Sequence, residues 1–339
     1  MSRLCRNLLI SFLVVAILAG FGKVRAEGPK NLFKVASLAP EGSIWAKRFN
    51  EFSQEVLNET KGEAGFRSYP GGVMGDDRAM FRKLKIGQLQ GGGFTMTGIG
   101  EMVPDFRVMG IPFLFNSYDE VDRVLTRLWP RLQAAFAEKD LVLLAVSEVG
   151  FLYTMSTSPL TTEEDFRKSK CWAPEGDPIS NAYLEMIGVT PIQLAIPDVL
   201  TALQTGLIDT VFNGFYGSIV LQWFTRIKYI TDIPFAYNYG AIVLDKSSFS
   251  RLSPEGAAVV LKSAKKYFGM LVQDTRKSNE EALIALQKQG ITMVPATEEA
   301  TLAFKAQRDK TVAKIIGNAF SLEIYEETMA VLGNNRGRE

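Results

Sequence analysis

The sequence predicts an α/β protein of two domains, and three observations support this. After the first 26 residues, short β-like runs alternate with amphipathic helical stretches, the pattern of a sheet with helices packed against it. The remaining chain of about 310 residues is longer than one hydrophobic core usually supports. A helical pattern from Ser253 to Gly290 is long enough to reach across both domains.

The first 26 residues predict an export signal. Arg3 and Arg6 precede an apolar run from Leu8 to Phe21, and Val24-Arg25-Ala26 offers small residues for cleavage. The run is about 14 residues long, shorter than the roughly 20 that a bilayer-spanning helix needs. We therefore expect residues 1–26 to be a cleaved signal peptide and the mature protein to reside in the periplasm.

The first domain is expected to begin with strand, helix and strand. Ser43 can cap a helix that places Trp45, Phe49, Phe52 and Val56 on one face. The predicted strands are 32–38, 65–69, 90–97 and 141–147, and a further helix is predicted over 76–86. A change of domain is expected near residue 150.

The second domain repeats the alternation of strand and helix. Strands are predicted over 151–157, 170–173 and 192–196, and helices over 178–187 and 198–205. We assign residues 27–150 and about 236–275 to domain I, and residues 151–235 and about 276–339 to domain II. No low-complexity linker interrupts the chain, so several ordered crossings are expected between the domains.

The helical segment near the C-terminal third is unusually long. Ser253 suits the N-cap, Pro254 the first helical position and Gly290 the C-terminal stop. At roughly 1.5 Å per residue, about 36 residues give a helix near 54 Å long, enough to brace two domains. The alternative is two ordinary helices with a break near Ser278-Asn279.

Several kinds of chemistry are absent from the sequence. There is no histidine, which removes Ser-His-Asp and Cys-His sites and most zinc sites. The glycines of 93–98 are spaced like a phosphate-binding loop, but Ile99 stands where that loop requires lysine. The acidic pairs Asp76-Asp77 and Glu163-Glu164 are interpreted as solvated helix starts. No enzyme activity is expected.

Charge and cysteine content narrow the function further. The 38 basic and 37 acidic residues are interspersed, which gives no basic surface for nucleic acid. Cys5 leaves with the signal peptide, so Cys171 remains alone and no internal disulfide can form. In its apolar surroundings Cys171 is interpreted as a small buried residue.

The mature chain resembles the substrate-binding proteins of tripartite ATP-independent (TRAP) transporters, of the dicarboxylate-binding type, along almost its whole length. The matching segments, in order, are Lys34–Pro40, Tyr69–Gly72 with Gly75, Ile111–Phe115, Thr162–Phe166, Lys170–Ala173 and Gly188–Asn213. The resemblance implies a periplasmic binding protein with a ligand cleft between two α/β domains and a long bracing helix. It also implies closure around the ligand and delivery to TRAP membrane permease subunits, with no cofactor.

Two departures from the family pattern bear on the ligand. In the pattern, an arginine that clamps a carboxylate follows the Asp-Phe segment, and Trp172 stands at that position here. A second arginine usually follows the Gly-Phe pair that opens the second domain, and here Leu152 follows Gly150-Phe151. Neither side chain can form the paired hydrogen bonds of a guanidinium with a carboxylate. A hydrophobic or neutral ligand is therefore expected.

The predicted ligand-binding residues are mostly aromatic. Trp172, Leu152 and Asn213 are selected by their positions in the family pattern, Asn213 as the family's ligand-contacting asparagine. The others are candidates for the cleft wall, each of which could equally be ordinary core: Trp45, Phe94, Met96, Phe151, Phe212, Phe215 and Tyr216. Acidic residues are sparse in these segments, so no metal is expected.

Two functions remain open from the sequence. The first is a binding protein that delivers a small apolar or neutral molecule to a TRAP permease. The second is a ligand-sensing periplasmic protein whose closed form docks on a receptor or another periplasmic partner. Neighbouring permease genes would favour the first.

Overall fold

The computed structural model describes residues 28–336, and the predicted signal peptide lies outside this range. A seven-stranded mixed sheet in this region has the order β2-β1-β3-β8-β4-β7, with β9 paired to β8. Its strands are β1 (Asn31–Ser37), β2 (Ala64–Tyr69), β3 (Gly91–Thr95), β4 (Leu141–Ser156), β7 (Thr210–Asn213), β8 (Tyr229–Asp245) and β9 (Thr292–Pro295). A second, two-stranded sheet pairs β5 (Trp172–Pro174) with β6 (Ile192–Leu194).

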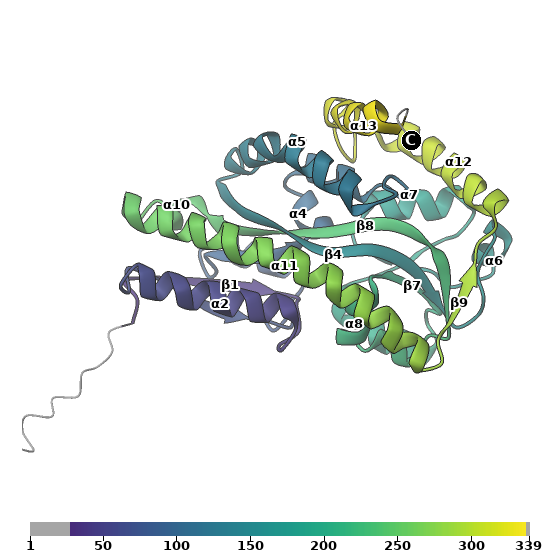
Figure 1. Cartoon of the computed structure of the whole chain (residues 1–339), viewed down its shortest axis with the longest axis horizontal. Coiled ribbons are helices and arrows are strands. Elements are labelled where there is room, and N and C mark those ends of the chain that lie inside the picture. The colour runs from purple at the N-terminus through teal and green to yellow at the C-terminus, as the bar shows by residue number, and fades with distance from the viewer. Residues whose placement is uncertain (1–27, 337–339) are drawn as a thin grey trace, which may run out of the picture.

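Helices cover the sheets, and α11 is the longest of those described (Figure 1). The helices before β7 are α2 (Ile44–Glu59), α3 (Asp77–Lys85), α4 (Met96–Gly100), η1 (Pro104–Gly110), α5 (Tyr118–Ala137), α6 (Glu163–Arg167), α7 (Pro178–Met186) and α8 (Ile196–Thr205). Those that follow β7 are α9 (Phe215–Val220), η2 (Trp223–Thr225), α10 (Lys246–Phe249), α11 (Pro254–Lys288), α12 (Glu298–Ile315) and α13 (Leu322–Arg336). The α/β class predicted from the sequence is confirmed.

Two strands, β4 and β8, run antiparallel to one another through the middle of the molecule. The prediction of separate strands over 141–147 and 151–157 is wrong, because β4 continues through Gly150. At this residue φ is +97°, and a Cβ atom would lie 2.7 Å from the Tyr118 hydroxyl. The register of β4 against β8 shifts between Glu148 and Gly150, so the strand bulges without ending.

The long helix α11 is continuous, so the alternative of two helices broken near residue 279 is wrong. Ser253 accepts a hydrogen bond from the Gly256 amide as the N-cap, and Pro254 is the first residue, as predicted. Asn279 does not break the helix, because its Nδ2 donates to the Thr275 carbonyl one turn earlier and to the Val149 carbonyl on β4. The helix therefore braces the central strands along their length.

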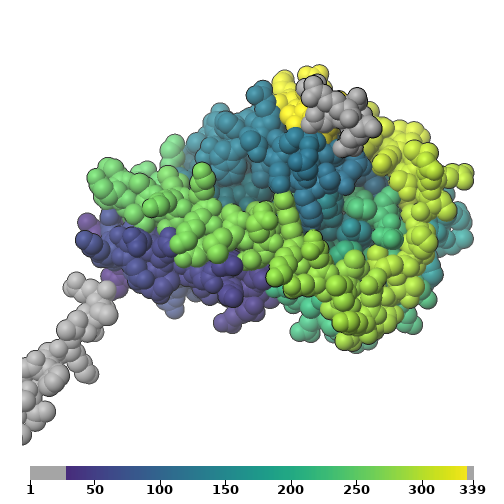
Figure 2. Space-filling view, in the orientation of Figure 1, coloured from purple at the N-terminus to yellow at the C-terminus, as the bar shows by residue number. Residues whose placement is uncertain are grey.

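The elements that cross the molecule are β4, β8 and α11. At one end α11 packs on α2 and shares a buried cluster around Phe52 and Phe268, while near its other end Leu286 joins a cluster with Trp172. Figure 2 shows α11 exposed along this face, with α2 beside it. The proposed domain boundaries stay a prediction, since these three elements run through the positions chosen for them.

Candidate functional site

A cavity of about 240 Å³ lies where the two predicted domains meet. Its wall combines β1, α2, β3 and α4 from one side with β4, β5, β7 and α9 from the other. Seven of the ten predicted ligand-binding residues line it: Trp45, Phe94, Met96, Leu152, Trp172, Phe212 and Asn213. The region chosen from the sequence thus coincides with a real cavity, and the role of each residue in binding stays a prediction.

Trp172 is the residue that the resemblance aligns with the family's clamping arginine, and this alignment stays a prediction. Its side chain is 4 % exposed, and its indole Nε1 donates to the Leu194 carbonyl at 3.0 Å. The ring meets Trp223 edge-to-face, with 5.2 Å between centroids. Since the one polar hydrogen of this side chain is already used within the protein, Trp172 presents only apolar surface to the cavity.

Leu152 lines the cavity from β4 and is 9 % exposed, so the second expected cation is also replaced by a buried apolar side chain. The nearest substitute considered from the sequence, Arg167, is absent from the cavity wall. Its guanidinium binds Glu163 and donates to the Ile187 carbonyl. Arg167 therefore does not supply a cation to the described cavity wall.

The other apolar wall residues are held firmly. The Trp45 indole donates to the Glu148 carbonyl at 2.8 Å, and Phe212 stacks on Phe235 with 4.5 Å between centroids. Met96 sits against Gly110, where a Cβ atom would lie 2.2 Å from its sulfur. These contacts give the cavity a preformed apolar wall.

Phe151, Phe215 and Tyr216 do not line the cavity. Because side chains alternate along a strand, Phe151 faces away from the side that Leu152 covers, and it packs against Tyr118. Phe215 stacks on Tyr153, with 4.2 Å between centroids. The Tyr216 hydroxyl accepts from the Ile44 amide at 3.0 Å, and its ring packs on Trp45, so it joins α9 to α2.

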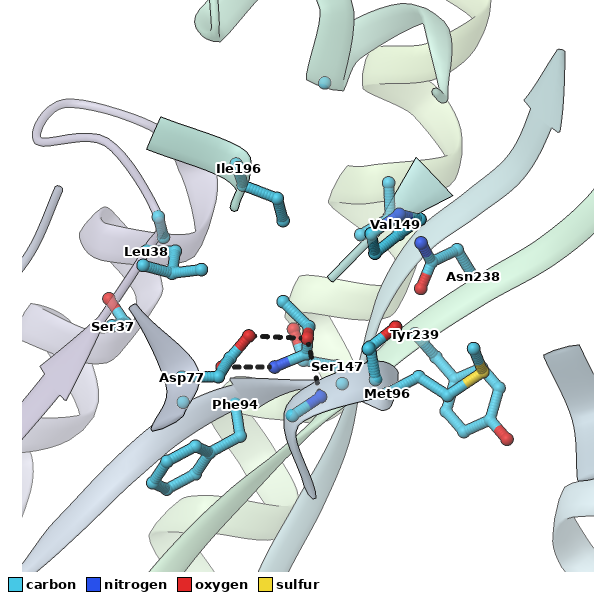
Figure 3. A pocket seen from close by; sticks show the side chains of 18 of the residues that line it. Ser37, Leu38, Asp77, Phe94, Met96, Ser147, Val149, Ile196, Asn238 and Tyr239 are labelled. Atoms are coloured by element: carbon cyan, nitrogen blue, oxygen red, sulfur yellow. Dashed lines mark hydrogen bonds between the residues drawn. The ribbon is translucent and has the colours of Figure 1, made fainter. Parts of the chain in front are cut away.

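Polar side chains that the sequence analysis missed also line the cavity: Ser37, Asp77, Ser147 and Asn238 (Figure 3). Ser147 and Asn238 interrupt otherwise apolar stretches of the two long strands, and this interruption is the signal that could have identified them. Asn213 is 6 % exposed, and its Oδ1 accepts from the Gly214 amide.

Most charged side chains of the cavity wall are acidic, whereas a receptor for carboxylates needs cationic groups. Of the described residues that line the cavity, six are acidic, namely Asp76, Asp77, Glu101, Glu148, Glu175 and Asp177, and Arg78 is the only cation. All six lie outside the aligned segments, in which acidic residues were expected to be sparse. The aligned segments alone therefore did not predict the acidic part of the wall.

Arg78 is already paired. Its Nε lies 2.7 Å from Glu101, and its Nη1 lies 2.6 Å from Glu175, which follows β5 on the other side of the cavity. These hydrogen bonds, with that to Glu101 the strongest influence, raise the pKa of the Arg78 guanidinium. A ligand carboxylate would have to compete with these two partners for this cation.

Arg107 is a second cation close to the site, but it does not belong to the wall. It is 6 % exposed and its guanidinium lies against Gly100. Burial lowers the pKa of Arg107, while the nearby carboxylates of Asp177 and Glu101 raise it. The charge of Arg107 is thus partly balanced by two acidic residues.

Burial disfavours the charged forms of three carboxyl groups in the wall. Burial raises the pKa of Asp77 to about 6, against the opposing effect of hydrogen bonds from Thr95. Burial likewise raises the pKa of Asp177 and of Glu148. These three groups make the cavity unfavourable for a further negative charge.

Other candidate chemistry is limited in the part of the chain that the structure describes. Residues 28–336 contain no cluster of acidic or cysteine side chains arranged to hold a metal. Cys171 is fully buried, as predicted, and burial raises the pKa of its thiol to about 12. No described helix combines the length and apolar character that a membrane span requires.

A two-domain α/β fold with a brace helix and a cavity between the domains is typical of solute-binding proteins. The sequence pattern of bacterial extracellular solute-binding protein family 7 matches residues 35–318, and the chain belongs to this family. It is an extracytoplasmic solute-binding protein of the TRAP type, as the resemblance indicated.

Relatives and solved structures agree on the fold. The 2,3-diketo-L-gulonate-binding periplasmic protein of Escherichia coli strain K12 is 24% identical over 253 residues, covering 74% of this chain and 76% of its own. The C4-dicarboxylate-binding periplasmic protein of Rhodobacter capsulatus is 24% identical over 260 residues, covering 76% and 77%. The galactonate complex of a sugar acid binding protein from Advenella mimigardefordensis superposes with a TM-score of 0.84 at 19% identity, covering 91% and 99%.

Proposed function

We propose that this protein captures a small, largely apolar molecule without a carboxylate and delivers it to a TRAP-type membrane permease. The observation that carries the proposal is the cavity wall itself. Both clamp positions hold buried neutral side chains, Trp172 and Leu152, and the only cation among the described wall residues is paired with two carboxylates.

The proposed ligand class differs from the ligands named for the similar proteins. The names of the similar proteins and complexes refer to acids: a diketogulonate, C4-dicarboxylates and galactonate. In the cavity described here, a carboxylate would be withdrawn from water without a free arginine to bind it, and it would lie near the Asp77 carboxyl. An unpaired buried charge costs several kcal/mol, on the order of the whole affinity for a small ligand.

Export and delivery complete the proposed function. The apolar run between Arg6 and Lys23 supports export through a cleaved signal peptide. Membership of the family supports a membrane permease as the partner that receives the ligand. A stable closed form around an apolar ligand would be the state that the permease recognises.

Isothermal titration calorimetry with succinate, galacturonate and galactonate tests the ligand class. The wild-type protein should bind none of the three with a dissociation constant below about 1 mM, an affinity of about 4 kcal/mol. A Leu152→Arg/Trp172→Arg variant that retains the wild-type fold should gain at least tenfold for one of them. Leu152→Met is the matched control, because it keeps the volume of the side chain and adds no charge. Micromolar binding of any of these acids by the wild type would refute the proposal.

A further inference from the structure

Phe113 has a strained backbone. It lies in the loop between η1 and α5, and its φ is +53°, a left-handed conformation that is rare for a bulky residue. Such a conformation costs free energy and persists only where surrounding contacts hold it. The Phe113 amide donates to the Phe235 carbonyl at 2.7 Å, and the Phe113 carbonyl accepts from the Arg308 guanidinium at 2.7 Å. Strand β8 and helix α12 therefore hold this turn together.

The turn directs the Phe113 ring into a different buried cluster from that of its neighbours. Ile111, Leu114 and Phe115 belong to the cluster that includes η1 and α5. Phe113 is 6 % exposed and instead belongs to a cluster with side chains of α7, β7, β8 and α12. Helices α7 and α12 contact each other at this end of the molecule (Figure 1). The strained backbone thus brings a ring of this loop to strands that form the cavity wall.

Phe113 supports the cavity wall from behind. Its ring lies edge-on to that of Phe235, with 5.5 Å between centroids, and Phe235 stacks on Phe212 at 4.5 Å. Phe235 and Phe212 line the cavity, whereas Phe113 does not. The ring of Phe304 stacks on Phe113, with 5.8 Å between centroids. Phe113 therefore lies between α12 and the wall, and it stops Phe235 from moving away from the ligand.

A second, much smaller cavity borders the same rings. Its volume is about 10 Å³, and Phe113, Phe235 and Phe304 are among the residues that line it. A shorter side chain at position 113 would add its lost volume to this void, and Phe235 would then have room to shift into it. The space left for a ligand in the main cavity therefore depends on Phe113.

We propose that Phe113 is a positioning residue that sets the length of ligand the cavity accepts, because it holds Phe235 and Phe212 in the wall. This inference rests on the proposed function, since it concerns the size limit for a largely apolar ligand. It adds a determinant of specificity that lies outside the cavity and is fixed by Arg308 on α12. Phe113 acts on the ligand through Phe235, without touching it.

Displacement of the neutral dye N-phenyl-1-naphthylamine by a series from 1-butanol to 1-decanol tests the inference on the full mature chain. In wild type, affinity should rise with chain length until the cavity is full. Phe113→Leu removes roughly the volume of one methylene group, so it should move this limit by about one carbon. The first alkanol beyond the wild-type limit should gain about fourfold in affinity relative to the shorter ones, the factor that one further buried methylene provides.

Phe320→Leu is the matched control for the ring. Phe320 is 1 % exposed and stacks on Tyr325, and neither residue lines the cavity. The same loss of volume at this position should lower the urea midpoint and leave the chain-length limit unchanged. An effect on the limit then reports on the cavity wall and not on a general loss of packing.

A second pair of variants tests the backbone turn separately from the ring. Arg308→Met removes the hydrogen bond to the Phe113 carbonyl and keeps the ring, so it should move the limit in the same direction as Phe113→Leu. Asp309→Asn is its control, because it removes the ion pair of Arg308 and leaves that hydrogen bond in place. It should leave the limit unchanged. The urea midpoint of each variant establishes that it folds.

The outcomes distinguish this inference from the proposed function. If alkanols bind the wild type but Phe113→Leu leaves the limit unchanged, or if Phe320→Leu moves it equally, the role of Phe113 is refuted and the proposed function stands. If Phe113→Leu does not fold, Arg308→Met decides by the same criterion. If neither the dye nor any alkanol binds the wild type, both are refuted.

Discussion

Arg276 should be the side chain whose loss most destabilises the junction between α11 and the central strands. Its guanidinium lies 2.6 Å from the Glu148 carboxylate, which is 2 % exposed, and 2.5 Å from Asp122. It also covers the Tyr118 ring at 4.4 Å. Tyr237 donates to the same Glu148 carboxylate at 3.0 Å. Arg276 therefore neutralises a buried charge in the wall of the cavity.

The loss in the free energy of unfolding depends on whether the substitution leaves a buried charge without its partner. Arg276→Met leaves Glu148 buried without a cation and should lower the free energy of unfolding by about 3–5 kcal/mol. Glu148→Gln should cost only about 1–2 kcal/mol, because the amide still accepts from Tyr237 and Arg276 still binds the half-exposed Asp122. The double variant should cost about as much as Glu148→Gln alone, with a coupling energy of about 2 kcal/mol or more.

Urea unfolding at pH 7 measures these differences, provided that the dependence on denaturant is unchanged between variants. The pH dependence of the stability of Arg276→Met provides a second test. Burial raises the pKa of Glu148, and hydrogen bonds from Arg276 lower it, so removing Arg276 should raise this pKa further. The stability lost in Arg276→Met should then shrink as the pH falls and Glu148 becomes protonated. Additive costs, or a loss below about 1 kcal/mol, would refute the reasoning.

Three further predictions concern the cavity and its crossing elements. Because burial raises the pKa of Asp77 to about 6, the stability that its neutral form provides is lost as pH rises through 6. Asp77→Asn should therefore gain stability relative to wild type between pH 5 and pH 7, as measured by the urea midpoint without ligand. If the difference between the two midpoints does not change over this range, the prediction is wrong. Arg78→Ala removes a half-exposed ion pair with Glu175, so ligand should dissociate about two- to fivefold faster in stopped-flow experiments, with a smaller difference at high salt. Asn279→Ala leaves the Val149 carbonyl unpaired and should cost about 1–3 kcal/mol in urea unfolding, a loss that exposed side chains of α11 should not reproduce.

The sequence predicted the elements that are marked by nearby residues, such as N-caps and the apolar face of a helix. The N-caps Ser43 and Ser253 lie where expected, as does the buried face of α2 around Phe52. The strand β8 was not predicted, although it is the longest of the described strands. Its sequence carries Asp232, Pro234 and Asn238, which look like loop residues. Pairing with β4 along its whole length overrides that local signal.

The apolar part of the site was more predictable than its polar part. Motif positions selected Trp172 and Leu152, and both line the cavity. Phe151 was misplaced because side chains alternate along a strand, so that Phe151 and Leu152 cannot both face the cavity. Asp76 and Asp77 were interpreted as a solvated helix start because carboxylates are favourable at the N-terminus of a helix, but both line the cavity. Only the fold reveals that Asp77 meets Thr95 and turns into the cavity.

The central claim is that this cavity binds a largely apolar ligand, whereas the names of the similar proteins refer to acids. Mass spectrometry of an organic extract from protein purified without added ligand tests it most directly, because a largely apolar cavity of about 240 Å³ between two domains can retain its ligand through purification. We expect a largely apolar compound without a carboxylate, at close to one molecule per protein, and Trp172→Arg should lose it. A stoichiometric sugar acid or dicarboxylate in the extract would contradict the claim.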